Sequence, residues 1–174
     1  AGLPNKDNGL ELNYNKAAFD DSNWKTIKAP KLWEEQGYRG LNGIAWYRKS
    51  IILDKKQVDT GIVLSLGKID DYDVCWVNGV EVGATNVYNV DRVYTVPASI
   101  LKEGENTIAI KITDAGGGGG LYSPARDVYF TSGNTKVSLA GDWKLKFTEV
   151  TPETNALNPN DYPTLLFNGM VSPI

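Results

Sequence analysis

Histidine is absent from this sequence of 174 residues. Without histidine, the chain cannot build a Ser-His-Asp or Cys-His nucleophile arrangement or bind a metal through imidazole. A pair of carboxylates or a lysine base remains available for acid–base chemistry. Most hydrolytic chemistry is therefore excluded for this chain acting alone. We assign it no catalytic residue, no metal ligand and no cofactor.

Cysteine is nearly absent too, because Cys75 is the only one. No internal disulfide can form, which is weak support for a reducing compartment, because many exported bacterial proteins also lack disulfides. Cys75 lies in the middle of an expected strand with no histidine to activate it. We therefore expect a small buried residue rather than a nucleophile.

Long hydrophobic runs and blocks of positive charge are missing as well. The sequence has no apolar stretch of about 18 residues and no pattern typical of a signal peptide. Its net charge is -3, and basic residues are not interleaved with aromatic ones. These features argue against nucleic acid and against a membrane as partners.

Alternating apolar and polar residues dominate the rest of the sequence, as in strands with one buried face. The clearest examples are Ile108 to Ile112 and Trp143 to Phe147, and Asn78-Gly79 is a strong signal for a tight hairpin turn. Many short strands with little helix predict an all-β fold, an antiparallel β-sandwich or jelly roll, over residues 1–150. Residues 151–174 are rich in Pro, Asn and Thr, and we expect an extended connector.

Five consecutive glycines, Gly116–Gly120, follow the isoleucine strand and Asp114. A phosphate-binding P-loop would continue with Lys-Ser or Lys-Thr and a helix, and a linker would separate two cores; neither follows here. The run instead predicts a loop at one end of the sandwich, left without side chains so that a ligand or another domain can approach its backbone.

Asp70, Asp71 and Asp73 place three carboxylates within four positions. Clustered oxygens suit sugar hydroxyls or calcium, whereas turn chemistry at a solvated strand entry is the plainer explanation, which we favour. Trp33 lies in a loop-like segment and, with Tyr122, is the better candidate for an exposed sugar-stacking ring. The full set of candidates for a ligand-binding or domain-facing surface is Trp33, Asp71, Asp73, Arg92, Asp114, Gly117, Gly118 and Tyr122.

Three motifs together resemble the sugar-binding domain of family-two glycoside hydrolases. They are Phe19-Asp20-Asp21-Ser22-Asn23-Trp24, the G-x-x-W-Y-R pattern at Gly43 to Arg48, and W-V-N-G-x-x-V-G at Trp76 to Gly83. The resemblance covers about residues 19–113 and implies a galactose-binding-like jelly roll.

Two further stretches resemble the sandwich inserted into sialate O-acetylesterases. One is the Asp-x-Gly-rich segment from Asp114 to Tyr122, and the other is the final segment from Pro163 to Ile174, which contains Phe-Asn-Gly-Met. This resemblance implies a non-catalytic insert whose partner is the Ser-hydrolase domain of the same parent chain. A glycan is a further partner, and the location would be periplasmic or secreted.

Three hypotheses follow for the function. The first is the insert of a sialate O-acetylesterase-like hydrolase, in which the glycine run faces the catalytic domain or its substrate. The second is a free-standing carbohydrate-binding module, and the third is an ancillary domain of a family-two glycosidase. None of the esterase's nucleophile or histidine motifs is present, so no catalytic residue is transferred by the resemblance.

Overall fold

The computed structural model describes residues 3–152. Their helices and strands, in chain order, are β1 (Lys25–Ala29), η1 (Trp33–Gln36), β2 (Leu41–Leu53), α1 (Lys55–Thr60), β3 (Ile62–Asp70), β4 (Tyr72–Val77), β5 (Val80–Thr85), β6 (Asp91–Val96), η2 (Ala98–Ile100), β7 (Gly104–Asp114), β8 (Gly120–Leu121), η3 (Ala125–Asp127), β9 (Tyr129–Ser132), β10 (Thr135–Ser138) and β11 (Gly141–Pro152). The predicted connector over 151–174 lies almost entirely outside the described residues. No helix in the described range is long and apolar enough to cross a membrane.

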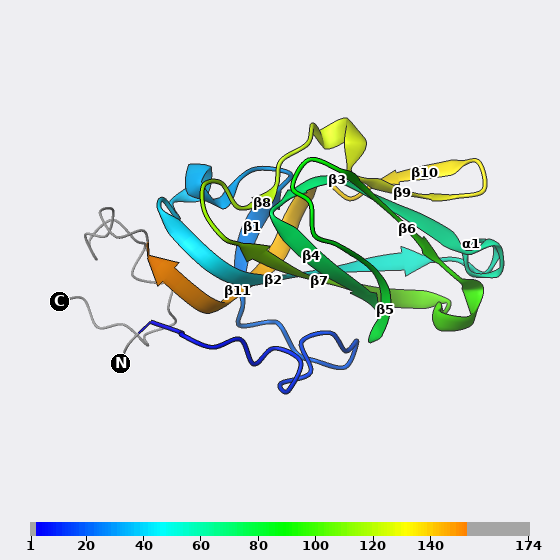
Figure 1. The fold of residues 1–174 in the computed structure, drawn as a ribbon. Helices are drawn as coiled ribbons and strands as arrows, with labels where there is room; N and C mark the ends of the chain where they lie inside the picture. The colour runs from blue at the N-terminus through cyan, green and yellow to red at the C-terminus, as the bar shows by residue number, and fades with distance from the viewer. Residues whose placement is uncertain (1–2, 153–174) are drawn as a thin grey trace.

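The strands form two antiparallel sheets that pack face to face (Figure 1). The first sheet has the strand order β1-β11-β2-β7-β4-β5, and the second has the order β10-β9-β3-β6, with β8 added on β3. Long central strands give the first sheet its register, with Tyr47 of β2 opposite Ile110 of β7 and Leu145 of β11. The all-β antiparallel sandwich predicted from the sequence is confirmed.

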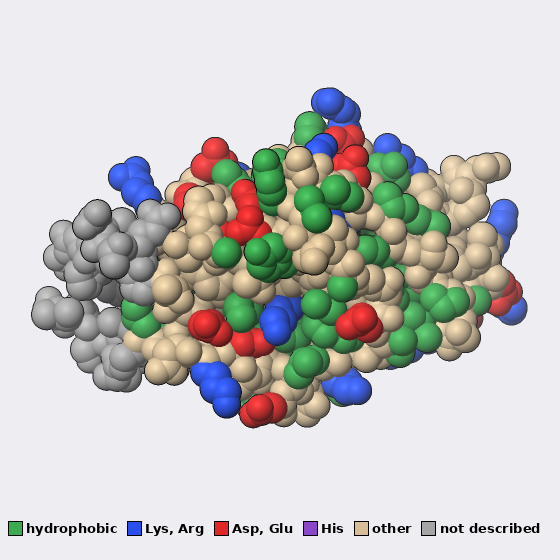
Figure 2. Space-filling model, viewed as in Figure 1, with side chains coloured by type: hydrophobic (Ala, Val, Ile, Leu, Met, Phe, Trp, Pro, Cys, Tyr) green, Lys and Arg blue, Asp and Glu red, His purple; other side chains and the backbone are tan. Residues whose placement is uncertain are grey.

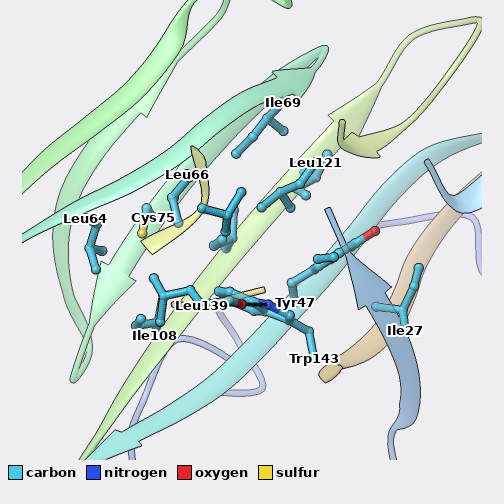
Figure 3. Packing of buried hydrophobic residues seen from close by; sticks show 14 of the residues in the cluster. Ile27, Tyr47, Leu64, Leu66, Ile69, Cys75, Ile108, Leu121, Leu139 and Trp143 are labelled. Atoms are coloured by element: carbon cyan, nitrogen blue, oxygen red, sulfur yellow. Dashed lines mark hydrogen bonds between the residues drawn. The ribbon is translucent and has the colours of Figure 1, made fainter. Parts of the chain in front are cut away.

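The main core lies between the two sheets and is built by the alternation seen in the sequence. Ile108, Ile110 and Ile112 of β7 are fully buried there, as are Leu64 and Leu66 of β3. Figure 3 shows this packing, including Tyr47, Trp143 and Cys75. Cys75 is the predicted small buried residue, because it is fully buried and burial raises the pKa of its thiol well above the usual value.

A second aromatic cluster covers the other face of the six-stranded sheet. Trp46 and Trp76 stack with ring centroids 5.1 Å apart, and Tyr14 and Trp24 pack beside them. Tyr14 and Trp24 come from residues 3–24, which we call the N-terminal strap; it runs along this sheet in Figure 1. Trp76 is therefore buried under the strap rather than between the sheets.

The hairpin turn predicted at Asn78-Gly79 is present, whereas one short helix was not predicted. Asn78 and Gly79 both have positive φ, 50° and 83°, as a type I′ turn requires. Helix α1 was not predicted, because it is short and buries no residue. Its only sequence signal is a capping box. The Asp54 side chain accepts a hydrogen bond from the Gln57 backbone N–H, and the Gln57 side chain accepts one from the Asp54 backbone N–H.

Candidate functional site

Four carboxylates gather around the glycine run at one end of the sandwich. Glu34 comes from η1, Asp70 and Asp71 from the junction of β3 and β4, and Asp114 from the end of β7. We call these four residues and Gly116–Gly120 the acidic end. Figure 2 shows acidic side chains next to hydrophobic ones around the position of β8, which Figure 1 locates.

The glycine run is held at both ends by hydrogen bonds to carboxylates. At its start, Ala115 donates its backbone N–H to Asp71 Oδ2 at 2.8 Å, and Gly116 donates to Asp114 Oδ1 at 2.9 Å. At its far end, Gly119 donates to Glu34 Oε2 at 3.0 Å and accepts from the Trp33 backbone at 2.9 Å. The loop is therefore a defined structure and not a flexible linker.

The five glycines differ in what surrounds them. A Cβ at Gly119 would lie 2.1 Å from the Trp33 ring, and Gly120 has a φ of +109° with the Tyr47 hydroxyl 3.0 Å from its Cβ position. Gly116 and Gly117, in contrast, have nothing within 4 Å of that position. We had expected the neighbour of the whole run to lie outside the chain. That is wrong for the second half, which packs on Trp33 and Tyr47.

The expectation that Trp33 is exposed is also wrong. Its side chain is fully buried, its Nε1 donates to the Leu41 carbonyl at 2.9 Å, and its ring packs edge-on against Phe147. Gly119 covers the ring from outside. Trp33 therefore supports the glycine run from beneath and has no ring face to offer a sugar.

Burial and mutual repulsion raise two pKa values in the acidic end. The pKa of Asp114 rises to about 8, because the residue is buried and because Glu34, Asp71 and Asp70 repel its charge, although the Gly116 N–H opposes the rise. The pKa of Asp70 rises to about 7, first through burial and then through the hydrogen-bonded carboxyl of Asp71 and the charge of Glu34. At neutral pH, Asp114 is thus mostly a neutral acid.

Two buried polar atoms in this region have no hydrogen-bond partner among the described residues. They are Asp114 Oδ2 and the Tyr47 hydroxyl, and both residues are almost fully buried. Burial, together with the charge of Glu34, raises the pKa of Tyr47, so its hydroxyl stays protonated. Unsatisfied buried groups of this kind are uncommon, and burying them without a hydrogen bond is unfavourable in the interior of the acidic end.

Asp73 and Arg92 form a buried ion pair between the two sheets. Arg92 Nε lies 2.6 Å from Asp73 Oδ1, and neither side chain is exposed. The guanidinium also donates to the carbonyls of Val87, Val90 and Asp71. Both residues were ligand candidates from the sequence, but their side chains are buried and join β4 to β6.

The accessible part of the acidic end is formed by other groups. Ala115, Gly116 and Gly117 expose their backbone, and Asp70 and Asp71 are half-buried. The half-buried Tyr122 donates its hydroxyl to the Tyr88 carbonyl at 2.6 Å, next to the exposed Tyr88 side chain.

Of the predicted set, Asp71, Asp114, Gly117, Gly118 and Tyr122 are brought to this end. Sequence reasoning missed Glu34, Tyr47 and Tyr88, which no motif connects to the glycines. Within residues 3–152, no group of three or more Asp, Glu or Cys side chains is arranged to hold a metal ion.

Comparison with known proteins agrees with this fold. Residues 11–118 match the family described as the beta-galactosidase second all-beta domain. No curated protein matches the sequence.

Similar solved structures include a Bacteroides uniformis beta-glucuronidase (TM-score 0.58, 21% identity, 86% of this chain and 16% of that chain). A beta-glycosidase from Bacteroides vulgatus is similar too (TM-score 0.58, 24% identity, 72% of this chain and 18% of that chain). A glycosyl hydrolase family 2 member from Bacteroides cellulosilyticus is a third (TM-score 0.56, 21% identity, 76% and 18%).

These structures share the sandwich fold, and the chain spans less than a fifth of the length of each. They are glycosidases, whereas the resemblance of two stretches, Asp114 to Tyr122 and Pro163 to Ile174, had suggested a sialate O-acetylesterase insert. The family match covers well over half of the sequence, including the motifs from Phe19 to Gly83 and the isoleucine strand. The chain belongs to the family of the beta-galactosidase second all-beta domain.

Proposed function

We propose that this chain is an accessory, non-catalytic domain of a family-two-type glycoside hydrolase and that its acidic end faces the sugar substrate. The observation that carries the proposal is the glycine run. Its start is fixed by Asp71 and Asp114, yet the outer side of Gly116 and Gly117 is bare. A backbone held in place but left uncovered suits close approach of a sugar.

Two further properties support this orientation. Displaced pKa values, as at Asp70 and Asp114, tend to cluster at functional sites. The half-buried carboxylates of Asp70 and Asp71 can accept hydrogen bonds from sugar hydroxyls, and the exposed Tyr88 ring provides an apolar surface for a sugar face. Asp114 itself is 2% exposed, so its role is to hold the loop rather than to touch a glycosidic bond.

The esterase hypothesis is the second candidate. Its most specific support, the segment from Pro163 to Ile174, lies outside the described residues, and the family match favours the glycosidase alternative. In either case the partner would be a catalytic domain, and this chain would be inert alone. We expect no turnover of p-nitrophenyl acetate or p-nitrophenyl β-galactoside above a buffer blank.

Sugar binding tests the proposal directly. Methyl β-D-galactoside would be added to the 174-residue chain, with amide chemical shifts followed by NMR. We expect saturable shifts centred on Asp71, Gly117 and Tyr88 with a Kd in the millimolar range, about -4 kcal/mol. A Tyr88→Ala variant, which removes an exposed ring, should weaken binding about fivefold. Val137→Ala, an exposed truncation on β10, is the matched control and should change nothing.

The outcomes separate the hypotheses. Saturable shifts confined to another face, or none at all, would contradict the proposed role of the acidic end. Micromolar binding that is lost in a Tyr122→Ala variant would favour a free-standing carbohydrate-binding module instead.

A further inference from the structure

A hollow of about 510 Å³ lies between the N-terminal strap and β11, away from the acidic end. Its walls are formed by seven residues of the strap between Pro4 and Tyr14, Asp7 not among them, and by Lys146, Phe147 and Thr148 of the strand. In Figure 1 the strap leaves the N-terminus beside β11 and continues along the sheet. The volume falls within the range of small-molecule sites. No residue of the hollow belongs to the acidic end.

The walls of this hollow are fixed by the fold. Asp7 accepts hydrogen bonds from Trp46 Nε1 at 2.9 Å and Thr148 Oγ1 at 2.8 Å, and its other oxygen pairs with Lys111 at 2.8 Å. The Val150 backbone donates to the Pro4 carbonyl at 2.7 Å. The backbone of the strap is thus held against β11 at this place, which lowers the entropic cost of binding.

Lys146 is the unusual residue in the hollow. It is half-buried, and its Nζ has no hydrogen bond or ion pair within residues 3–152. Its neighbour on the same sheet face, Lys111, is in contrast paired with Asp7. Burial and the positive charge of Lys25 lower the pKa of Lys146. A partly desolvated ammonium without a counter-charge is costly, and an anion would relieve that cost.

The remaining lining suits an oxyanion. Among the described residues that line the hollow, Lys6 adds a second ammonium and Asn5 and Asn8 supply amide donors, against one carboxylate, that of Glu11. Charge-assisted hydrogen bonds from lysine to an oxyanion are short and comparatively strong. We propose that this hollow binds a small oxyanion, a sulfate or carboxylate group, through Lys146 and Lys6.

Anion titration of the 174-residue chain tests this site. Sodium sulfate, sodium D-glucuronate and D-glucose would be added at constant ionic strength, with chloride as the balancing salt, and amide shifts followed by NMR. We expect saturable shifts at Lys146, Thr148 and Asn8 with both anions and none with glucose. Tighter binding of glucuronate than of sulfate would identify the ligand of the hollow as an anion carried on a sugar. Equal binding of the two would identify it as a free anion.

Charge variants decide whether Lys146 is responsible. Lys146→Gln should weaken binding at least about tenfold, whereas Lys56→Gln, the same change on the exposed surface of α1, should alter it less than about twofold. Glu11→Gln removes the opposing carboxylate and should tighten binding. Thermal unfolding of each variant verifies that it is folded.

The proposal is overturned if neither anion gives saturable shifts at these residues. It is also overturned if folded Lys146→Gln binds as tightly as the unaltered chain. Galactoside binding at the acidic end is a separate measurement on different residues, so either site can fail without the other.

Discussion

Adding one methyl group at Gly119 should destabilise the fold, whereas the same change at Gly116 should not. The Cβ of Gly119→Ala would lie 2.1 to 2.6 Å from three atoms of the Trp33 ring, where ordinary contact begins near 3.4 Å. Gly119 does not have a positive φ, so alanine adds no backbone strain there. The whole effect therefore comes from the collision with the ring.

The magnitude follows from how firmly that ring is held. Trp33 is fully buried, is anchored through Nε1 to the Leu41 carbonyl, and packs against Phe147 with 5.2 Å between ring centroids. Overpacking a fixed core site costs about 1–3 kcal/mol, and partial expulsion of a buried ring costs more. We expect a loss of about 3 kcal/mol in the free energy of unfolding, or a fall in Tm of about 6–12 °C for a chain of this size.

Urea unfolding followed by tryptophan fluorescence measures this loss, and Gly116→Ala provides the matched control. Gly116 has nothing within 4 Å of its Cβ position, so its variant should lie within about 0.5 kcal/mol of the unaltered chain. Equal midpoints for the two variants would refute the packing of the glycine run on Trp33.

Three other changes probe the remaining features. Asp114→Asn should reduce the pH dependence of stability: the raised pKa means that wild-type stability is full below about pH 4 and falls as pH rises through about 8. Since salt screens part of the repulsion, the free energy of unfolding of Asp114→Asn should rise by about 2 kcal/mol relative to that of the wild type between pH 4 and pH 9, as measured by urea titrations. If the free energies of unfolding of the two proteins ran parallel over this pH range, the pKa shift would be contradicted. Arg92→Met should leave Asp73 buried without its charge partner and cost about 3–5 kcal/mol by the same assay, whereas a loss below 1 kcal/mol would argue against a buried pair. Gly9→Ala places a Cβ 2.3 Å from the Trp46 ring, so limited proteolysis should cut the strap sooner than in wild type, and unchanged cleavage would show that the strap does not lie on that ring.

The fold was predictable because its signals are local. Ile108, Ile110 and Ile112 alternate with Ala109 and Lys111, so the three large apolar side chains lie on one face of the strand and that face is expected to be buried. Asn78-Gly79 similarly determines its own turn, because both residues tolerate positive φ.

The candidate site was only partly predictable, because its contacts join distant segments. The loop-like sequence around Trp33 suggests an exposed side chain, and no neighbouring residue in the sequence indicates that Gly119 covers its ring. The pairing of Arg92 with Asp73 likewise depends on the two sheets meeting at that point. The residue types and their spacing showed which side chains could bind a ligand, but not whether those side chains face solvent.

The N-terminal strap has a consequence for how the molecule opens. Because the strap covers one face of the six-stranded sheet and the second sheet covers the other, the central strands β2 and β7 are shielded on both sides. Their amide hydrogens should exchange with solvent only when the whole domain unfolds, whereas β10, whose residues are all exposed, should exchange through local fraying. Detachment of the strap alone would then expose a tryptophan-lined sheet face without unfolding the domain, giving a partly open state that hydrogen exchange could detect at the Trp46 indole N–H, which donates to Asp7 of the strap.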